Sequence, residues 1–108
     1  MTKLINKHFG MIVSIEPTEK TKDDATWLWR KDYEGFLGIM HIYKSERKCP
    51  EKHFIAICDI DLNGLETSIG ELKGKDNILT LTTTNSIYTF KIVNIDGRTV
   101  NKWQQKSY

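Results

Sequence analysis

Residues 78–93 read ILTLTTTNSIYTFKIV, and this stretch decides the fold class. Its first arm alternates leucine with threonine. Its second arm alternates Tyr88, Phe90 and Ile92 with polar side chains, and the sequence TNS at 84–86 lies between the arms. Alternation with a period of two on both sides of a short polar turn predicts an antiparallel hairpin with one buried face and one solvated face.

Further strands are predicted upstream of this hairpin. The segments with strand composition, each bounded by polar or turn-forming residues, are 11–16, 27–30, 36–43, 53–60 and 65–72. We expect residues 26–43 to form a hairpin. The nearly continuous apolar run at 53–60 predicts a strand buried on both faces. Helical periodicity is weak, so only residues 2–9 and the last eight residues could hold a helical turn.

This pattern predicts a mainly β fold with at most one short helix. Six to seven short strands, spaced by about ten residues and joined by hairpin turns, favour a small antiparallel barrel or sandwich. A strongly bent antiparallel sheet with one short helix is the alternative. The length of 108 residues is that of a single β-rich domain, residues 1–108.

The composition limits the kinds of binding partner and the cellular compartment that we expect. The chain is 39% hydrophobic and 28% charged, which argues against disorder, and its net charge of +2 does not point to a polyanion. No apolar run approaches the roughly 18 residues of a membrane span, and the N-terminus lacks a secretory apolar region. We therefore expect a cytoplasmic protein with no membrane partner. Lysine outnumbers arginine, which favours an AT-rich genome such as that of a low-GC bacterium or its phage.

The sequence DIDLNG at 59–64 matches the opening of a calcium-binding loop. The bidentate carboxylate of such a loop would fall at Gly70, which has no side chain to supply it. We therefore expect a β-turn, in which Asn63 and Gly64 supply positive φ angles.

Cys49, His53 and Cys58, with His41 in a neighbouring predicted strand, are residue types that bind zinc. Their spacing matches no standard zinc knuckle, so we predict no metal site. Cys49 lies near lysines and could be an activated nucleophile with His53 as its base, but no third orienting group follows from the sequence. We expect no catalytic residues and no cofactor, and hence no enzyme.

Aromatic, basic and amide side chains are the best candidates for binding. The predicted ligand-binding residues are Trp27, Trp29, Arg30, Tyr33, Asn85, Ser86 and Tyr88. A period of two places both tryptophans on one face of a strand, and that face is either part of the core or a binding surface. Hydroxyl and amide groups at the tip of the last hairpin add hydrogen-bonding capacity.

We therefore expect a small non-enzymatic binding module, encoded by a phage or mobile element. It would sequester a nucleotide-like ligand or act as an inhibitor that blocks a protein partner. One alternative is a single-stranded RNA or DNA binder that uses the aromatic and basic residues at 27–36. Another is a small enzyme of unknown reaction. Uncovered strand edges favour a homodimer.

Overall fold

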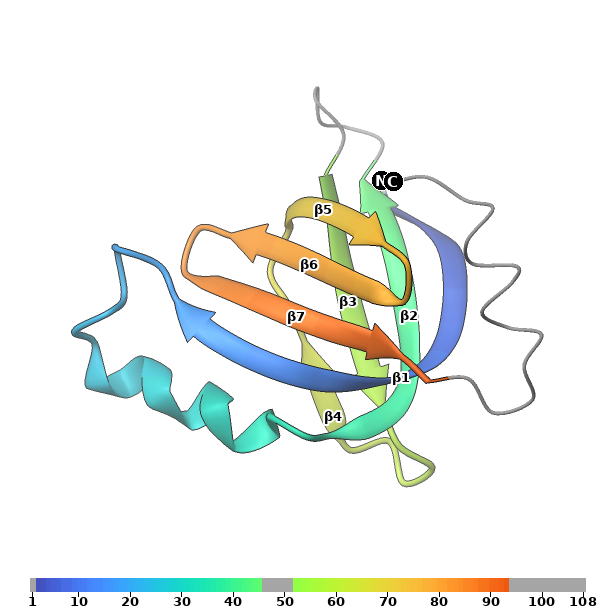
Figure 1. The fold of residues 1–108 in the computed structure, drawn as a ribbon, viewed down its shortest axis with the longest axis horizontal. Coiled ribbons are helices and arrows are strands. Elements are labelled where there is room, and N and C mark those ends of the chain that lie inside the picture. The colour runs from blue at the N-terminus through green and yellow to red at the C-terminus, as the bar shows by residue number, and fades with distance from the viewer. Residues whose placement is uncertain (1, 46–51, 94–108) are drawn as a thin grey trace.

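The structure is a computed structural model that describes residues 2–45 and 52–93 (Figure 1). Its elements, in chain order, are β1 (Thr2–Pro17), the 3₁₀ helix η1 (Ala25–Tyr33), β2 (Leu37–Ser45), β3 (Lys52–Cys58), β4 (Gly64–Glu66), β5 (Gly70–Lys75), β6 (Ile78–Thr83) and β7 (Ser86–Ile92). Cys49 and the last eight residues, for which a helical turn is predicted, lie outside the described residues. Within the described ranges, no helix has the length and apolar character needed to cross a membrane.

The strands form one antiparallel sheet that closes on itself. Its order is β2-β1-β7-β6-β5-β3-β4, and an additional pairing between β2 and β3 completes the ring. β3 pairs with β5 at His53 and with the short β4 at its other end, so β4 is an extra strand outside the ring of six. The predicted small antiparallel barrel with one short helix is confirmed.

The first strand bends enough to close the barrel. β1 pairs with β2 along its first half and with β7 along its second half, and its register shifts between Ile12 and Ser14. Such a bulge bends a strand and increases its twist. The strand passes close to its neighbours at Gly10, where a Cβ atom would lie 2.7 Å from the Lys91 carbonyl oxygen. Residues 2–9 are thus part of a strand, and the predicted helical turn there is wrong.

The predicted hairpin at 78–93 is confirmed as β6 and β7. Leu79 and Leu81 face inward beside Tyr88, Phe90 and Ile92, as their alternation predicts. The other hydrophobic residues of the core are Ile12, Ile15, Met40, Ile42, Ile55 and Ile57 from β1, β2 and β3, together with Trp27, Leu65 and Leu72. This interior is an apolar core.

Two upstream predictions are wrong in detail. The segment 53–60 is not buried on both faces, because β3 alternates buried and partly exposed residues and Ile60 lies beyond it, 96% exposed. The predicted strand at 65–72 is two strands, β4 and β5. The chain leaves the sheet between them, where the Thr67 hydroxyl donates to the Ser68 carbonyl and accepts a hydrogen bond from the backbone N–H of Ile55.

Candidate functional site

Residues 25–33 form a 3₁₀ helix, so the predicted strand at 27–30 and its hairpin are wrong. The Asp24 carboxylate caps the helix by accepting hydrogen bonds from the backbone N–H (2.9 Å) and the hydroxyl (2.6 Å) of Thr26. The hydroxyl, followed by the backbone N–H, holds the pKa of Asp24 below its usual value. This local capping, together with the docking of Trp27, outweighs the strand preference of a Trp-Leu-Trp sequence. Nine residues is long for a helix of this type.

The helical period explains where the two tryptophans point. A 3₁₀ helix has three residues per turn, so residues three apart share a face. One face carries Trp27, Arg30 and Tyr33. The second face carries Thr26, Trp29 and Asp32, and the third carries Ala25, Leu28 and Lys31. Trp27 is 2% exposed, whereas Trp29 is 50% exposed. The expectation that both tryptophans share one face is therefore wrong.

Trp27 enters the barrel wall and meets Ser86. Its indole Nε1 donates a hydrogen bond of 2.7 Å to the Ser86 hydroxyl. The backbone N–H of Ser86 donates in turn to the Thr83 hydroxyl, which donates back to the Ser86 carbonyl. Tyr88 is also buried and stacks with Phe90, with ring centroids 6.1 Å apart. A binding role for Trp27, Ser86 and Tyr88 stays a prediction, but all three occupy core positions with little surface for a ligand.

Asn85 holds a loop in place. Its backbone carbonyl accepts hydrogen bonds from the backbone N–H of Thr18 and the hydroxyl of Thr21. The Thr18 hydroxyl donates to the neighbouring Thr84 carbonyl at 2.8 Å. The tip of the β6–β7 hairpin therefore anchors the loop that leads into η1. These contacts engage the backbone carbonyls of Thr84 and Asn85, and a binding role for the Asn85 side chain stays a prediction.

Trp29, Arg30 and Tyr33 remain together near the surface. The Arg30 guanidinium carbon lies 4.6 Å from the centroid of the Trp29 ring, which is a cation–π arrangement. Tyr33 meets Trp29 edge to face at 6.1 Å, and its other contact, with Phe36 at 5.9 Å, joins the group to the core. Leu28, on the adjacent face of the helix, is 56% exposed. We call Leu28, Trp29, Arg30 and Tyr33 the η1 cluster.

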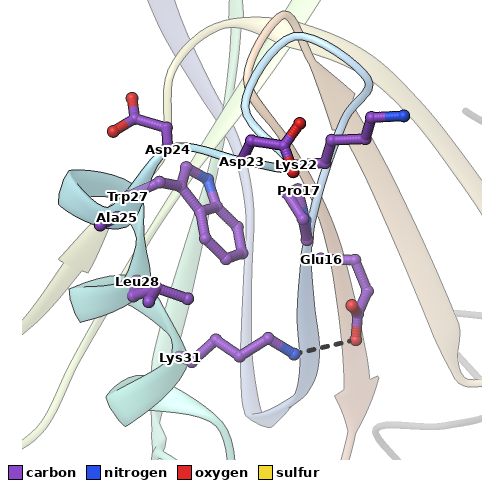
Figure 2. A pocket seen from close by; sticks show the side chains of 9 residues that line it. All are labelled: Glu16, Pro17, Lys22, Asp23, Asp24, Ala25, Trp27, Leu28 and Lys31. Atoms are coloured by element: carbon purple, nitrogen blue, oxygen red, sulfur yellow. Dashed lines mark hydrogen bonds and ion pairs between the residues drawn. The ribbon is translucent and has the colours of Figure 1, made fainter.

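A cleft of about 380 Å³ lies beside the η1 cluster, between the helix and the end of β1 (Figure 2). Trp27, Leu28 and Pro17 form its apolar wall. Its charged side chains are Glu16, Lys22, Asp23, Asp24 and Lys31. Three carboxylates against two ammonium groups oppose the binding of phosphate, so the cleft is poorly suited to a nucleotide.

An ion-pair network joins this cleft to the barrel. Lys31 Nζ lies 3.1 Å from Glu16 Oε2 and 3.3 Å from Glu34 Oε2, and the hydrogen bond to Glu16 raises the pKa of Lys31. The backbone N–H of Ile15 donates to Glu34 at 2.9 Å. That hydrogen bond is the main cause that lowers the pKa of Glu34; Lys31 lowers it further, against the opposing effect of burial. Lys31 and Glu34 are therefore charged at neutral pH, and η1 is held against β1.

A second surface, not predicted from the sequence, lies on the outside of β1, β2 and β3. It is a hollow of about 570 Å³ with a largely apolar lining. Phe9, Ile39 and Cys58 lie side by side across it, because these residues are in register on the three strands. The sequence does contain a sign of this surface, because β2 and β3 carry apolar residues on the outward face as well as on the inward face.

The turn at 59–64 lies at one end of this hollow and is confirmed as a turn. The Asp59 carboxylate accepts hydrogen bonds from the backbone N–H groups of Asp61 (2.9 Å) and Asn63 (3.0 Å). The residue with a positive φ is Leu62, at 65°, and not Asn63 or Gly64 as expected. Leu62 is 82% exposed. The turn therefore holds two apolar side chains, Ile60 and Leu62, out in solvent.

The candidate metal ligands do not converge. His53 is buried inside the barrel, whereas Cys58 lines the outer hollow together with His41. His53 and Cys58 are an odd number of residues apart on one strand, so their side chains point to opposite faces of the sheet. Over residues 2–45 and 52–93, no group of three or more His, Cys, Asp or Glu side chains is placed to hold a metal ion.

Comparisons of the chain with protein-family models, curated proteins and solved structures give no match. The candidate functional surfaces of the described residues are therefore the η1 cluster with its cleft and the outer hollow.

Proposed function

We propose that this chain is a small non-enzymatic module that acts in the cytoplasm by binding and occupying a protein partner through the η1 cluster. The observation that carries the proposal is the half-exposed Trp29 ring with the Arg30 guanidinium 4.6 Å from its centroid. Tryptophan, tyrosine and arginine are the residues that most often dominate the binding energy of protein interfaces.

The exposed apolar area of the cluster supports this proposal. Trp29 and Leu28 each leave about half of their surface in water. Full burial of a large apolar side chain contributes about 1.5–3 kcal/mol, so covering the remaining halves of both would favour association by a few kcal/mol. A partner that covers this cluster would gain that free energy.

The cluster is also pre-organised. Arg30 and Tyr33 contact the Trp29 ring, and the helix is held at one end by the Asp24 cap and near the other by the hydrogen bond from Ile15 to Glu34. Side chains that are already ordered lose less conformational entropy on binding. Binding through η1 would therefore need little rearrangement of the barrel.

The cleft beside η1 favours a protein over a nucleotide. An apolar wall with carboxylates at its rim suits a lysine or arginine side chain, whose stem is apolar and whose end is cationic. Phosphate groups would meet Glu16, Asp23 and Asp24. A single strand of nucleic acid stacking on Trp29 is the second candidate, because the same pair of ring and guanidinium can hold a base.

Self-association is part of the proposal. The ring closes between β5 and β3 only at Gly70 and His53, so residues 71–75 of β5 keep one edge without a partner strand among the described residues. The extra strand β4 is only three residues long.

Photo-crosslinking tests the use of η1. A photoreactive amino acid replaces Leu28 in one form of the full chain and the exposed Lys73 of β5 in a control form. We expect covalent adducts in cells from position 28 but not from position 73, and we expect Trp29→Ala to abolish them. Equal adducts from both positions, or adducts that survive Trp29→Ala, would overturn the proposal. Adducts removed by nuclease would replace the protein partner with nucleic acid.

A further inference from the structure

The cleft between η1 and the end of β1 adjoins the η1 cluster through Leu28. Leu28 belongs to the cluster and also lines the cleft, and it is 56% exposed. The exposed lining is largely apolar, with Trp27 on the helix side and Pro17 on the strand side (Figure 2). A partner that covers the η1 cluster therefore lies over the opening of the cleft and can place one side chain inside it.

The two ends of the cleft differ in what their charged groups contact. At one end Lys31 extends from the helix to β1, where its Nζ lies 3.1 Å from Glu16 Oε2 (Figure 2). The same Nζ lies 3.3 Å from Glu34 Oε2, so this end holds an ion-pair network made within the chain. Asp23 lies at the opposite end (Figure 2). A cation from a partner would therefore find its counter-charge at the Asp23 end.

Asp23 is the carboxylate of the cleft whose charge is not matched. The ammonium group of the neighbouring Lys22 points away from the cleft and lies 2.8 Å from Glu19 (Figure 2). The Asp24 carboxylate accepts hydrogen bonds from the backbone N–H and the hydroxyl of Thr26. Within the described part of the chain, no ion pair involves Asp23. Asp23 therefore leaves a negative charge beside an apolar wall.

We propose that the cleft takes one long cationic side chain, a lysine or an arginine, of the protein partner that covers the η1 cluster. This inference rests on the proposed function, because it names the partner residue that accompanies that contact. The apolar stem of the side chain packs between Leu28 and Pro17, and its charged end reaches Asp23. The volume of about 380 Å³ leaves room for a single side chain of this kind.

The charge of Asp23 acts mainly by excluding other partners. An exposed ion pair contributes little to affinity, because water and salt screen it. A carboxylate placed in the same position would be repelled by Asp23, and juxtaposed like charges suppress wrong partners. We therefore expect the partner to carry a lysine or arginine, and no acidic residue, where it meets the cleft.

Heteronuclear NMR of the full chain tests the proposal with small probes. The probes are the N-acetylated amides of lysine and arginine, with that of norleucine as the apolar control. We expect both cationic probes to shift the backbone amide signals of Asp23 and Leu28 in a saturable way, and norleucine to bind more weakly. Asp23→Asn should weaken the binding of the cationic probes by about two- to fivefold, the effect of an exposed charge pair. Asp23→Lys should abolish it.

Asp61→Lys is the matched control, because it changes the net charge equally at an exposed turn that does not line the cleft. It should bind the probes as the wild type does. Saturation by only one of the two cationic probes would support the proposal and identify the partner's residue. Norleucine binding as tightly as the cations, or Asp23→Lys binding them as the wild type does, would overturn it. Crosslinking from position 28 that depends on Trp29 would survive either result, so the proposed function and this inference can fail separately.

Discussion

The indole Nε1 of Trp27 donates a 2.7 Å hydrogen bond to the hydroxyl of Ser86, and both side chains are buried. This contact joins η1 to the start of β7 across 59 residues of sequence. It turns Trp27 into the barrel and, because the helix has three residues per turn, turns Trp29 outward. The position of the η1 cluster thus depends on a contact made in the core.

Ser86→Ala should lower the free energy of unfolding by about 1–3 kcal/mol, because the indole N–H loses its acceptor in a place that water does not reach. Urea unfolding measures this loss. In the Trp27→Phe background, Ser86→Ala should cost less, because the donor is already absent. If Ser86→Ala lowered the free energy of unfolding equally in both backgrounds, the hydrogen bond would not contribute to stability.

Alanine at the two tryptophans should have unequal consequences for stability. Trp27→Ala removes a fully buried ring and should lower the free energy of unfolding by about 3–5 kcal/mol. Trp29→Ala removes a half-exposed ring and should change it by less than about 1 kcal/mol. The pair is matched in residue type and helix, and differs only in burial. Similar losses for both variants would show that the two rings do not point in different directions.

Glu34→Gln tests the link between η1 and β1 through its pH dependence. The pKa of Glu34 is lowered in the folded chain from its ordinary value of 4.5. A lowered carboxyl pKa contributes stability that is present above that ordinary value and is lost as the pH falls through the folded pKa. The wild type should therefore be more stable than Glu34→Gln at pH 7, and the difference should shrink as the pH falls below about 4.5. Thermal unfolding across this range checks the trend; a constant difference would contradict it.

Substitutions at Leu62 test whether the backbone of the 59–64 turn is held at a positive φ. Leu62→Val should lower the free energy of unfolding by about 1 kcal/mol or more, because a β-branched residue is strongly disfavoured there. Leu62→Asn should preserve or slightly raise it, because asparagine tolerates that conformation. Chemical unfolding of the two variants, compared under conditions where the chain is monomeric, measures this difference. Equal effects would indicate an ordinary extended backbone at this residue.

The sequence was sufficient for features that depend on local alternation. The β6–β7 hairpin, the barrel class and the turn at 59–64 follow from neighbouring residues. Helix η1 does not, because tryptophan and leucine fit a strand as well, and the choice depends on the Asp24 cap and on a Ser86 that lies far along the chain.

The candidate sites also differ in how far the sequence alone could predict them. We predicted a binding role for Trp29, Arg30 and Tyr33 from their residue types. That prediction does not depend on whether a strand or a helix carries these residues. The outer hollow was missed because an apolar residue in a strand, such as Ile39, indicates burial without saying whether the core or a partner covers it. Leu62 was missed because the turn interpretation considered only backbone conformation.

The most direct test of the central claim is the affinity of the chain for the protein crosslinked at position 28. Titration calorimetry would compare the wild type with Trp29→Ala and with Thr82→Ala, a control on the solvent face of β6. We predict that Trp29→Ala weakens binding by about 30-fold, which corresponds to about 2 kcal/mol, while Thr82→Ala binds as the wild type does. An affinity of Trp29→Ala within about threefold of the wild type, in a variant of unchanged stability, would contradict the claim that the chain binds its partner through the exposed side of η1.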